Sequence, residues 1–411
     1  MKKIIFILFS NGLLVFSFAQ NKGVDYFINQ ALINSPLLKD YGNRILQNQA
    51  DSLSILAAYK PQVTGSSFNS YAPVIKGIGY DEIITSGRNF NALIGVNKIL
   101  PNKKNVTAQF ESLQLENQSI GNASRISEQE LKRTITAQYI TAYGDMLQLN
   151  FNKGIDSLLS KEEIILKKLT ESNVYRQVDY LAFLVTLQQQ QLLIKQLTIQ
   201  FQNDYAALNY LCGIADTATV VLQEPGITLN HLPGIENSVF FNQFVIDSQK
   251  LINSRTLVEF SYKPRFNLFA DAGFNSSFAY RAYKNFGTSF GISATVPIYD
   301  GKQKKIQYSK LDIAERTRQH YQSFFSGQYN QQVAQLTQQL QATTSLINDI
   351  NNQLRYSESL INVNGKLLEA GEARIADYIL ALNSFMNAKN LVTQNNINRL
   401  QIINQINYWN R

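Results

Sequence analysis

The chain has 411 residues, of which 45% are hydrophobic, so a disordered chain and a collagen-like fibre are excluded. Only 17% are charged, against roughly 25% in an ordinary soluble domain. Asn and Gln supply much of the polar surface and make up 12 of the 26 residues from Gln328 to Gln353. The net charge of +8 includes no long Lys/Arg block, so no nucleic-acid partner is expected. The single cysteine, Cys212, excludes a disulfide framework and is expected to be a small buried side chain.

Residues 1–19 have the pattern of a secretory signal sequence. Two lysines precede an apolar segment, which ends in small residues up to Ala19. No cysteine lies near this cleavage point, so no lipid anchor is expected. No run of 18 apolar residues follows, so the exported chain is predicted either to be water-soluble or to cross a membrane as β-strands.

Short matches recur about 200 residues apart in the same order, which indicates a tandem duplication. Tyr59-Lys60-Pro61 returns as Tyr262-Lys263-Pro264. Residues Arg176, Asp179 and Tyr180 return 198 positions later as Arg374, Asp377 and Tyr378. We predict a first repeat over residues 20–216, a linker over 217–234 and a second repeat over 235–411.

Each repeat contains a segment with the period-2 alternation of a β-hairpin, at about residues 62–99 and 265–298. In the second hairpin one face is aliphatic and aromatic: Phe266, Leu268, Ala270, Ala272, Phe274, Phe278, Tyr280, Phe286, Phe290, Ile292, Ala294, Val296 and Ile298. The opposite face is mostly Gly, Ser and Asn, which is typical of a membrane barrel. The edge of a soluble β-sandwich is the alternative.

Proline-free helical patterns follow both hairpins, from Lys103 to about Thr170 and from Lys302 to about Ala370. Nearly 70 residues of helix reach roughly 100 Å, which is too long for a compact core. Heptad-like spacing, as in the series Leu184, Leu187, Gln191, Ile194, Thr198, Phe201, Tyr205, Leu208 and Cys212, predicts supercoiling against neighbouring helices. An extracellular coiled-coil stalk is the alternative, but it would not account for the hairpins.

Four membrane-type strands per chain are too few for a barrel, since the smallest barrels close with about eight. The protein is therefore predicted to oligomerise. Two chains would supply eight strands and three would supply twelve; small residues on the polar face favour the larger barrel, which has an open lumen.

The chain resembles the TolC family of outer-membrane efflux ducts over nearly its full length. The segments that carry the resemblance are Ala31 to Leu37, Tyr59 to Gln62, Ala207 to Gly213, Val296 to Gly301, and Gly371 with Asp377. The resemblance implies an α+β membrane protein of the Gram-negative outer membrane. It would form a homotrimer with a 12-stranded barrel in the lipid and a long α-helical tunnel in the periplasm.

The sequence departs from the family pattern at three places. Leu100-Pro101-Asn102-Lys103 stands where the second repeat has Asp300-Gly301, Gln249 replaces Pro36, and Asn173 occupies the position of Gly371. The last exchange is mild, because Asn tolerates the left-handed turn conformation better than most residues.

Residues 173–179 and 371–377 lie where each long helix is expected to reverse into the next. The resemblance implies that these turns form the periplasmic tip, where the tunnel narrows and an adaptor protein docks. The predicted roles are an aperture ring for Asp377 and Asp179, ionic latches for Arg374 and Arg176, neighbouring packing for Tyr378 and Tyr180, and the turns themselves for Gly371 and Asn173. A ring of carboxylates favours cations. The alternative role for each aspartate is to cap a helix or to stabilise its dipole.

No enzymatic or metal chemistry is indicated by the sequence. His231 and His320 are isolated, no ligand spacing predicts a metal, and neither a phosphate loop nor a catalytic triad is present. No cofactor is expected. The predicted function is a passive exit duct for efflux or type I secretion, working with an inner-membrane pump and a periplasmic adaptor. A surface structural or adhesive protein with a coiled-coil stalk and a β head is the alternative, and a hydrolase is a more distant one.

Overall fold

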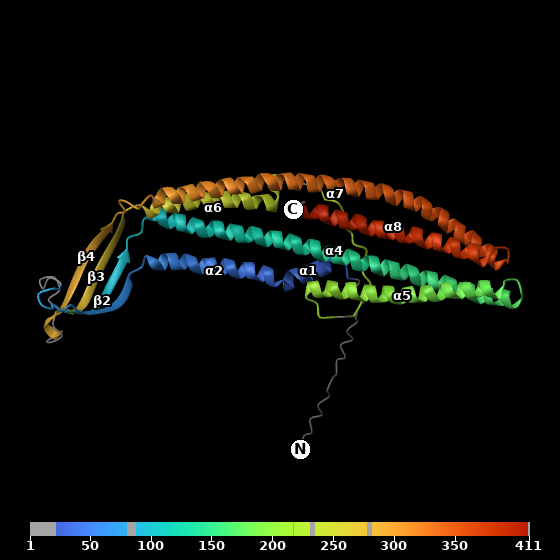
Figure 1. The fold of residues 1–411 in the computed structure, drawn as a ribbon, viewed down its shortest axis with the longest axis horizontal. Helices are drawn as coiled ribbons and strands as arrows, with labels where there is room; N and C mark the ends of the chain where they lie inside the picture. Colours follow the sequence, from blue (N-terminus) through green and yellow to red (C-terminus); the bar gives the residue numbers. More distant parts are fainter. Residues whose placement is uncertain (1–21, 80–87, 217, 231–234, 278–281, 410–411) are drawn as a thin grey trace, which may run out of the picture. The chain divides into compact units, whose positions relative to one another are not determined.

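The computed structural model describes residues 22–79, 88–216, 218–230, 235–277 and 282–409 (Figure 1). The predicted signal sequence lies outside these residues. The chain divides into two units, each of which is described separately. The first comprises the described residues of Met1–Ser35, Glu128–Pro233 and Asn330–Arg411, and the second those of Pro36–Ser127 and Gly234–Tyr329. Two long helices, α4 (Lys103–Glu171) and α7 (Gln303–Glu369), contribute residues to both units.

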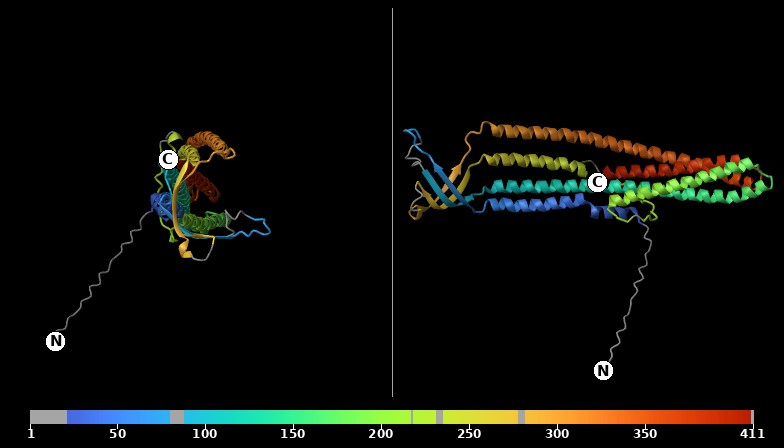
Figure 2. Two further views of the ribbon diagram at one scale, coloured as in Figure 1. Left: turned by 90° about the vertical axis from the view of Figure 1, so that its left-hand side faces the viewer. Right: turned by 60° about the horizontal axis from the view of Figure 1, so that its bottom comes forward.

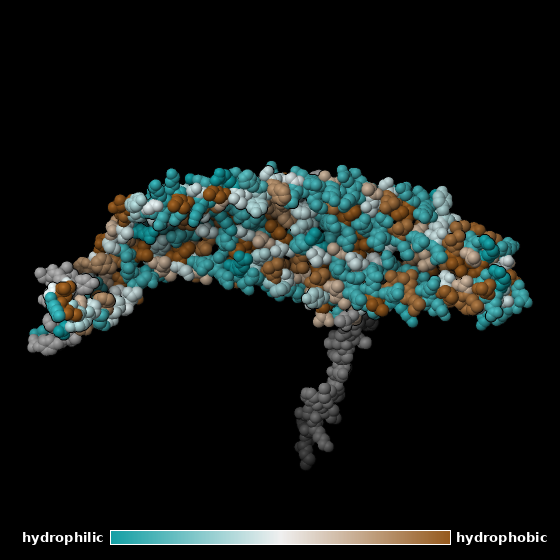
Figure 3. Space-filling model, viewed as in Figure 1, coloured by the Kyte–Doolittle hydropathy of each residue, from teal (hydrophilic) through white to brown (hydrophobic). Residues whose placement is uncertain are grey.

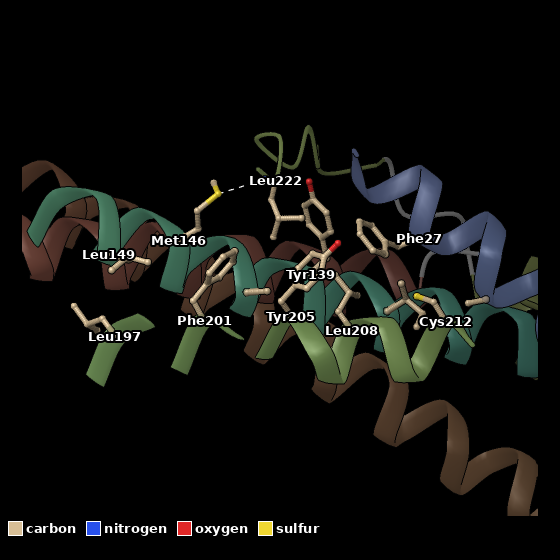
Figure 4. Packing of buried hydrophobic residues seen from close by; sticks show 13 residues of the cluster. Phe27, Tyr139, Met146, Leu149, Leu197, Phe201, Tyr205, Leu208, Cys212 and Leu222 are labelled. Carbon is tan, nitrogen blue, oxygen red and sulfur yellow. Dashed lines mark hydrogen bonds between the residues drawn. The ribbon is translucent and has the colours of Figure 1, made fainter. Parts of the chain in front are cut away.

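The first unit is helical. It contains α1 (Val24–Asn34), α5 (Gln177–Cys212), α8 (Ile375–Trp409) and the C-terminal parts of α4 and α7. One buried cluster joins α1, α4 and α5, with the rings of Phe27 and Tyr139 5.6 Å apart (Figure 4). Cys212 belongs to this cluster and is a buried free thiol, as predicted. A second cluster, centred on Phe183 and Leu382, joins the ends of α4, α5, α7 and α8 near their turns.

Burial along α5 has the predicted heptad-like spacing, but the stripe begins one residue earlier than the sequence suggested. The buried positions are Phe183, Gln190, Leu197, Phe201, Tyr205, Leu208, Asn209 and Cys212. Of the other residues that the sequence assigned to this face, Leu184 and Thr198 are half-buried, and the assignment of Gln191 was wrong because it is exposed. Either choice keeps the spacing of three and four residues, so periodicity alone could not fix the rotation of the helix.

Side-chain amides connect neighbouring helices, which explains much of the Asn and Gln content. In each case an amide N–H donates to a main-chain carbonyl of another element: Asn34 to Cys212, Asn122 to Val239, Gln138 to Asp204, Gln190 to Asn152, Asn253 to Ala108, Gln401 to Ala137, Asn404 to Arg133 and Asn407 to Thr228. The donor–acceptor distances run from 2.7 to 3.0 Å. A helical carbonyl has a second lone pair for such a bond. These uncharged contacts hold helices together where charged residues are scarce.

The second unit combines helices with an antiparallel sheet. Its elements include α2 (Pro36–Ala58), α6 (Val239–Ser261), β1 (Gln62–Tyr71), β2 (Arg88–Ile99), β3 (Arg265–Ser276) and β4 (Phe286–Thr295), with short 3₁₀ turns η1 (Ile235–Asn237) and η2 (Ala282–Lys284). The strand order is β1-β2-β3-β4, so the sheet joins both hairpins (Figure 2). The four strands per chain are confirmed. None of the helices in the described part of the chain has the length and hydropathy that a membrane-spanning helix requires.

The register of the sheet places the predicted apolar residues on one face. Leu268 lies opposite Ile292, and Ala270 lies opposite both Phe290 and Val96. The other face carries Gly, Ser and Asn together with Asp271, whose carboxylate accepts a hydrogen bond from Ser289 at 2.6 Å. Phe278 and Tyr280, which the sequence placed on the apolar face, lie outside the described residues.

The exchange of Pro36 for Gln249 has a visible consequence. α1 ends at Asn34 and a separate helix, α2, begins at Pro36, whereas α6 runs without interruption past Gln249. Proline lacks the N–H of a helix interior but suits a first helical position. The first predicted repeat therefore begins with two helices and the second with one.

Candidate functional site

The two helix turns of the first unit end their helices in the same way. After α4, the N–H of Asn173 donates to Thr170 and that of Val174 to Leu169. After α7, the equivalent bonds are made by Gly371 and its successor. Asn173 has a φ of 59° and Gly371 a φ of 76°, both left-handed, as these hydrogen bonds require. Both residues thus occupy the turn centres to which the sequence assigned them.

Each turn carries one bidentate ion pair within the same chain. The guanidinium of Arg374 donates to both carboxylate oxygens of Asp377 at 2.9 and 2.8 Å. Arg176 makes the same two bonds to Asp179 at 2.9 and 3.0 Å. The arginine side chains are 83% and 80% exposed, respectively. Each aspartate also lies in the first turn of its helix, where the N-terminal dipole favours a negative charge.

The ion pair affects the titration of the aspartate in the second turn. The hydrogen bond from Arg374 holds the pKa of Asp377 below its ordinary value. The Asp377 carboxylate therefore stays ionised to lower pH than an isolated one. The structure brings the four charged residues that the sequence singled out together in two pairs, each closed within its own turn.

The two turns also contact each other. Tyr175, in the first turn, donates from its hydroxyl to the carbonyls of Leu368 and Ala373, both at 2.9 Å. A Cβ added to Gly371 would lie 2.9 Å from Cγ1 of Val174. The two turns are therefore close-packed, and any side chain at position 371 would displace the first turn.

The paired tyrosines Tyr180 and Tyr378 have different environments. The Tyr180 hydroxyl donates to Glu163 at 2.6 Å, and this bond raises its pKa to about 12. Tyr378 is 1% exposed, and its hydroxyl has no hydrogen-bond partner among the described residues. The residue 198 positions after Glu163 is Ile361, so the second turn lacks the matching acceptor. Both tyrosines pack in the cluster beneath the turns, where the sequence placed them.

A buried carboxyl group lies behind the turns. Glu162 on α4 is 5% exposed, and one of its oxygens has no partner among the described residues. Burial, followed by the negative charge of Glu369 on α7, raises its pKa from 4.5 to about 7. Glu162 also lies close enough to Tyr378 on α8 to raise the pKa of that hydroxyl. Protonation of Glu162 therefore stabilises the packed turns, because the neutral carboxyl group costs less to bury than the charged carboxylate.

Sequence reasoning missed Tyr175 and Glu162. Tyr175 falls outside the repeated matches, because its counterpart is Ala373. Glu162 stands beside Glu163, and only the rotation of α4 decides which of the two is buried. Among the described residues, no group of three His, Cys, Asp or Glu side chains comes together to hold a metal ion. The arrangement packs the two turns together and presents two ion pairs at their surface.

Comparison with known proteins is informative only at the level of structure. No family model matches the sequence, and no curated protein does. The outer membrane protein VceC of Vibrio cholerae is similar with a TM-score of 0.72 and 13% identity, over 94% of this chain and 96% of that one. The CmeC outer membrane channel of Campylobacter jejuni has a TM-score of 0.70 and 13% identity, over 94% and 85%.

A third similar structure is the open state of the MtrE outer membrane channel of Neisseria gonorrhoeae, with a TM-score of 0.71 and 12% identity over 94% of this chain and 88% of that one. All three matches cover 94% of this chain. The chain therefore has the fold of the TolC-like outer membrane channels.

Proposed function

We propose that the protein is a passive exit duct of a Gram-negative outer membrane, assembled as a homotrimer, with its helical part in the periplasm. The observation that carries the proposal is the likeness of nearly the entire chain to solved outer membrane channels.

The sheet supports a shared barrel. Within the described residues, β1 pairs only with β2, and β4 pairs only with β3, so each has one open edge. Long exposed edges lead to aggregation unless another strand pairs with them. Pairing β1 of one chain with β4 of the next closes a ring, and three chains give the 12 strands that the resemblance implies. The small side chains on one face would then line the lumen.

The helices support the same assembly. An apolar stripe on α5 with spacing of three, four and seven residues remains exposed in one chain: Val178, Leu181, Val185, Leu192 and Ile199. Figure 3 shows that apolar residues are scattered among polar ones on the face of the molecule in view. A second heptad stripe on one helix is typical of a helix that packs against two neighbours. A neighbouring chain would cover it.

The turns described above would form the periplasmic aperture. Three chains would contribute three copies of Asp377 and three of Asp179, each held by Arg374 or Arg176. Opening the turns would widen the passage and expose the carboxylates, which favour cations at close quarters. Energy and cargo selection would come from an inner-membrane pump, and a periplasmic adaptor would hold the turns open.

Two measurements test the proposal. The protein is extracted from the outer-membrane fraction in mild detergent, and its mass is measured by light scattering with detergent correction. It is then inserted into planar bilayers, where Asp377→Ala should alter ion conductance and its block by divalent cations. A monomer that is soluble without detergent would refute the duct and favour the adhesive surface protein. A conducting trimer unaffected by Asp377→Ala would refute only the aperture role.

A further inference from the structure

Basic side chains are concentrated where the helices of the second unit meet the sheet. We define the basic collar as Lys60, Lys98, Lys103, Lys104, Lys263, Arg265, Lys302, Lys304 and Lys305. The four joints that contain it, residues 59–61, 98–104, 262–265 and 299–305, include one acidic residue, Asp300. Nine basic residues and one acidic residue give +8, which equals the net charge of the whole chain, also +8. The rest of the chain is therefore neutral on balance.

All four joints lie at the same end of the sheet. Gln62 at the start of β1 lies opposite Asn97, Ile99 at the end of β2 lies opposite Asn267, and Arg265 lies opposite Thr295. Four strands span three spacings of about 4.8 Å, so the joints fall within about 15 Å across the sheet. The collar is thus one patch, although its residues come from distant parts of the sequence.

The collar is accessible and largely unpaired. Eight of its side chains are exposed, and Lys304 is half-buried. Lys263 pairs with Glu259 at 3.2 Å, while no carboxylate of the described residues forms an ion pair with the other eight. The carboxylate of Asp300 is occupied, since it accepts a hydrogen bond from the N–H of Lys304 at 2.7 Å. The positive charge is therefore free to meet an external anion.

Two hollows at the joints have the size of a lipid headgroup. One, of about 560 Å³, is lined by Lys302, Lys304 and Lys305 with Tyr308 and Ser309, and by two carboxylates that already have partners, Asp300 and Asp312. The other, of about 460 Å³, is lined by Lys263 and Arg265 with Tyr59 and other joint residues. Binding sites for small molecules fall in this range of volumes.

The surroundings identify the anion as lipid. Just beyond the collar, on the apolar face, Phe266, Val296 and Ile298 are 47%, 53% and 96% exposed. Tyr262 lies beneath the Lys304 ammonium at 5.4 Å, and Tyr299 is exposed. Tyrosines and snorkelling lysines beside an exposed apolar band are typical of the headgroup level of a bilayer.

From these observations we infer that the basic collar binds anionic phospholipid headgroups of the periplasmic leaflet. The inference rests on the proposed function, because it places the sheet in the membrane and the helices in the periplasm. Basic clusters next to a membrane segment recognise anionic lipid through charge attraction and phosphate hydrogen bonds. The collar would fix the depth at which the barrel sits, so that the tunnel begins directly below the headgroups.

The test uses the full-length protein in a nonionic detergent. Binding of phosphatidylglycerol and phosphatidylcholine is measured by native mass spectrometry and by titration of a fluorescent analogue of each. The variant K302Q/K304Q/K305Q removes three collar charges, and the matched control K167Q/K168Q/K195Q removes three exposed lysines from the first unit. The variant K302R/K304R/K305R keeps the charge. Light scattering and circular dichroism verify that each variant is assembled.

We expect the wild type to prefer phosphatidylglycerol. Each charge contributes roughly fivefold to affinity, so the collar variant should bind phosphatidylglycerol about 100-fold more weakly, while the control and the arginine variant bind as the wild type does. Equal binding of both lipids, or an unchanged affinity in the collar variant, would overturn the inference while leaving a membrane-inserted trimer intact. Lipid A binding that the same substitutions abolish would contradict the assignment to the periplasmic leaflet. A protein absent from the outer membrane would overturn both the collar and the duct.

Discussion

The hydroxyl of Tyr175 donates a hydrogen bond to the carbonyl of Ala373, the residue 198 positions later that occupies the equivalent place in the second turn. One repeat thus supplies a tyrosine where the other supplies a small residue, and the larger side chain bridges to its own counterpart. A symmetric pair could not do this, because two tyrosines would compete for the same space. The hydrogen bonds that hold the two turns together therefore depend on a position at which the repeats differ in sequence.

Replacing this tyrosine should loosen both turns. Tyr175→Phe keeps the ring and loses the single hydroxyl proton that the carbonyls of Leu368 and Ala373 share, an interaction worth about 1–1.5 kcal/mol. We expect amide hydrogen exchange over residues 172–176 and 370–374 to accelerate about tenfold, because these bonds must break when the turns separate. Tyr308→Phe in the second unit serves as the control. Equal exchange in Tyr175→Phe and the wild type would show that the turns are held by packing alone.

Removing an arginine should act opposite to removing its aspartate. Arg374→Ala leaves the Asp377 carboxylate without its bidentate partner, so the aperture gains free negative charge. The cation-to-anion permeability ratio in planar bilayers should rise roughly twofold, whereas Asp377→Ala should lower it. Arg255→Ala breaks an exposed ion pair with Asp312 in the second unit and should leave the permeability ratio unchanged. A decrease of the ratio in Arg374→Ala would contradict the aperture assignment.

The buried Glu162 predicts that rising pH loosens the turns. In the unfolded chain this carboxyl ionises near 4.5, but in the packed turns its pKa is about 7. Between these values the packed state holds a proton that the open state releases, so the stability of the packed turns is highest below about pH 4.5, falls as pH rises toward 7 and levels off above it. Exchange of residues 368–378, corrected for the intrinsic rate, should increase by roughly 50- to 100-fold from pH 5 to pH 8.

Glu162→Gln should remove this pH dependence, since the amide remains neutral. Glu163→Gln is the matched control, because the amide oxygen of the new side chain can still accept the hydrogen bond from the Tyr180 hydroxyl. Asp145, whose pKa is also raised to about 7, lies elsewhere on α4, and Asp145→Asn controls for a general effect of buried acids. If Asp145→Asn abolished the dependence and Glu162→Gln did not, the proton would belong to a different site.

The turn centres should respond unequally to substitution. Gly371→Ala places a Cβ on a left-handed residue and against Val174, which costs about 1–2 kcal/mol. Asn173→Gly relieves only the small strain of an Asn in the left-handed conformation and should leave the stability of the first turn nearly unchanged. Limited tryptic cleavage after Arg374 reports opening of the turn and should proceed about five- to thirtyfold faster in Gly371→Ala. An unchanged rate would mean that the turn adjusts without opening.

Assembly of the sheet should depend on Gly273. Its φ is 155°, and a Cβ there would lie 2.2 Å from the carbonyl oxygen of Ala92, so β2 and β3 could not stay paired. Gly287 lies directly opposite Gly273 in β4, and a Cβ there meets nothing within 4 Å. We expect Gly273→Ala to prevent recovery of the oligomer from the outer-membrane fraction and Gly287→Ala to permit it. Equal recovery would contradict the strand register.

Much of the fold could be predicted because the two repeats share the same long helical stretches and the same strand alternation. The absence of proline after Lys103 and Lys302 indicated two helices that end close to where the structure ends them, and alternation gave the faces of β3 and β4. The rotation of α5 could not be predicted, because Phe183 and Leu184 are both apolar. The aperture and latch roles of Asp377 and Arg374 stay predictions.

The parts of the site that escaped sequence analysis depend on tertiary contacts. Glu162 and Glu163 are identical in type, and only the packing of α4 against α7 and α8 makes one buried and the other accessible. Tyr175 acts across 198 residues, and its partner atoms are main-chain carbonyls, which no side-chain pattern reveals. Such contacts become visible only when the two turns are seen together.

The amide bonds between helices have a consequence for the conditions under which this protein can work. Salt screens interactions between charges, and acid or alkali removes charges, but neither acts on a neutral amide that donates to a carbonyl. Asn253 and Gln190 therefore hold their neighbouring helices equally well in brackish, acidic or dilute surroundings. A scaffold built this way keeps its helix contacts when the salt or acidity around it changes, while the ion pairs at the turns remain free to respond.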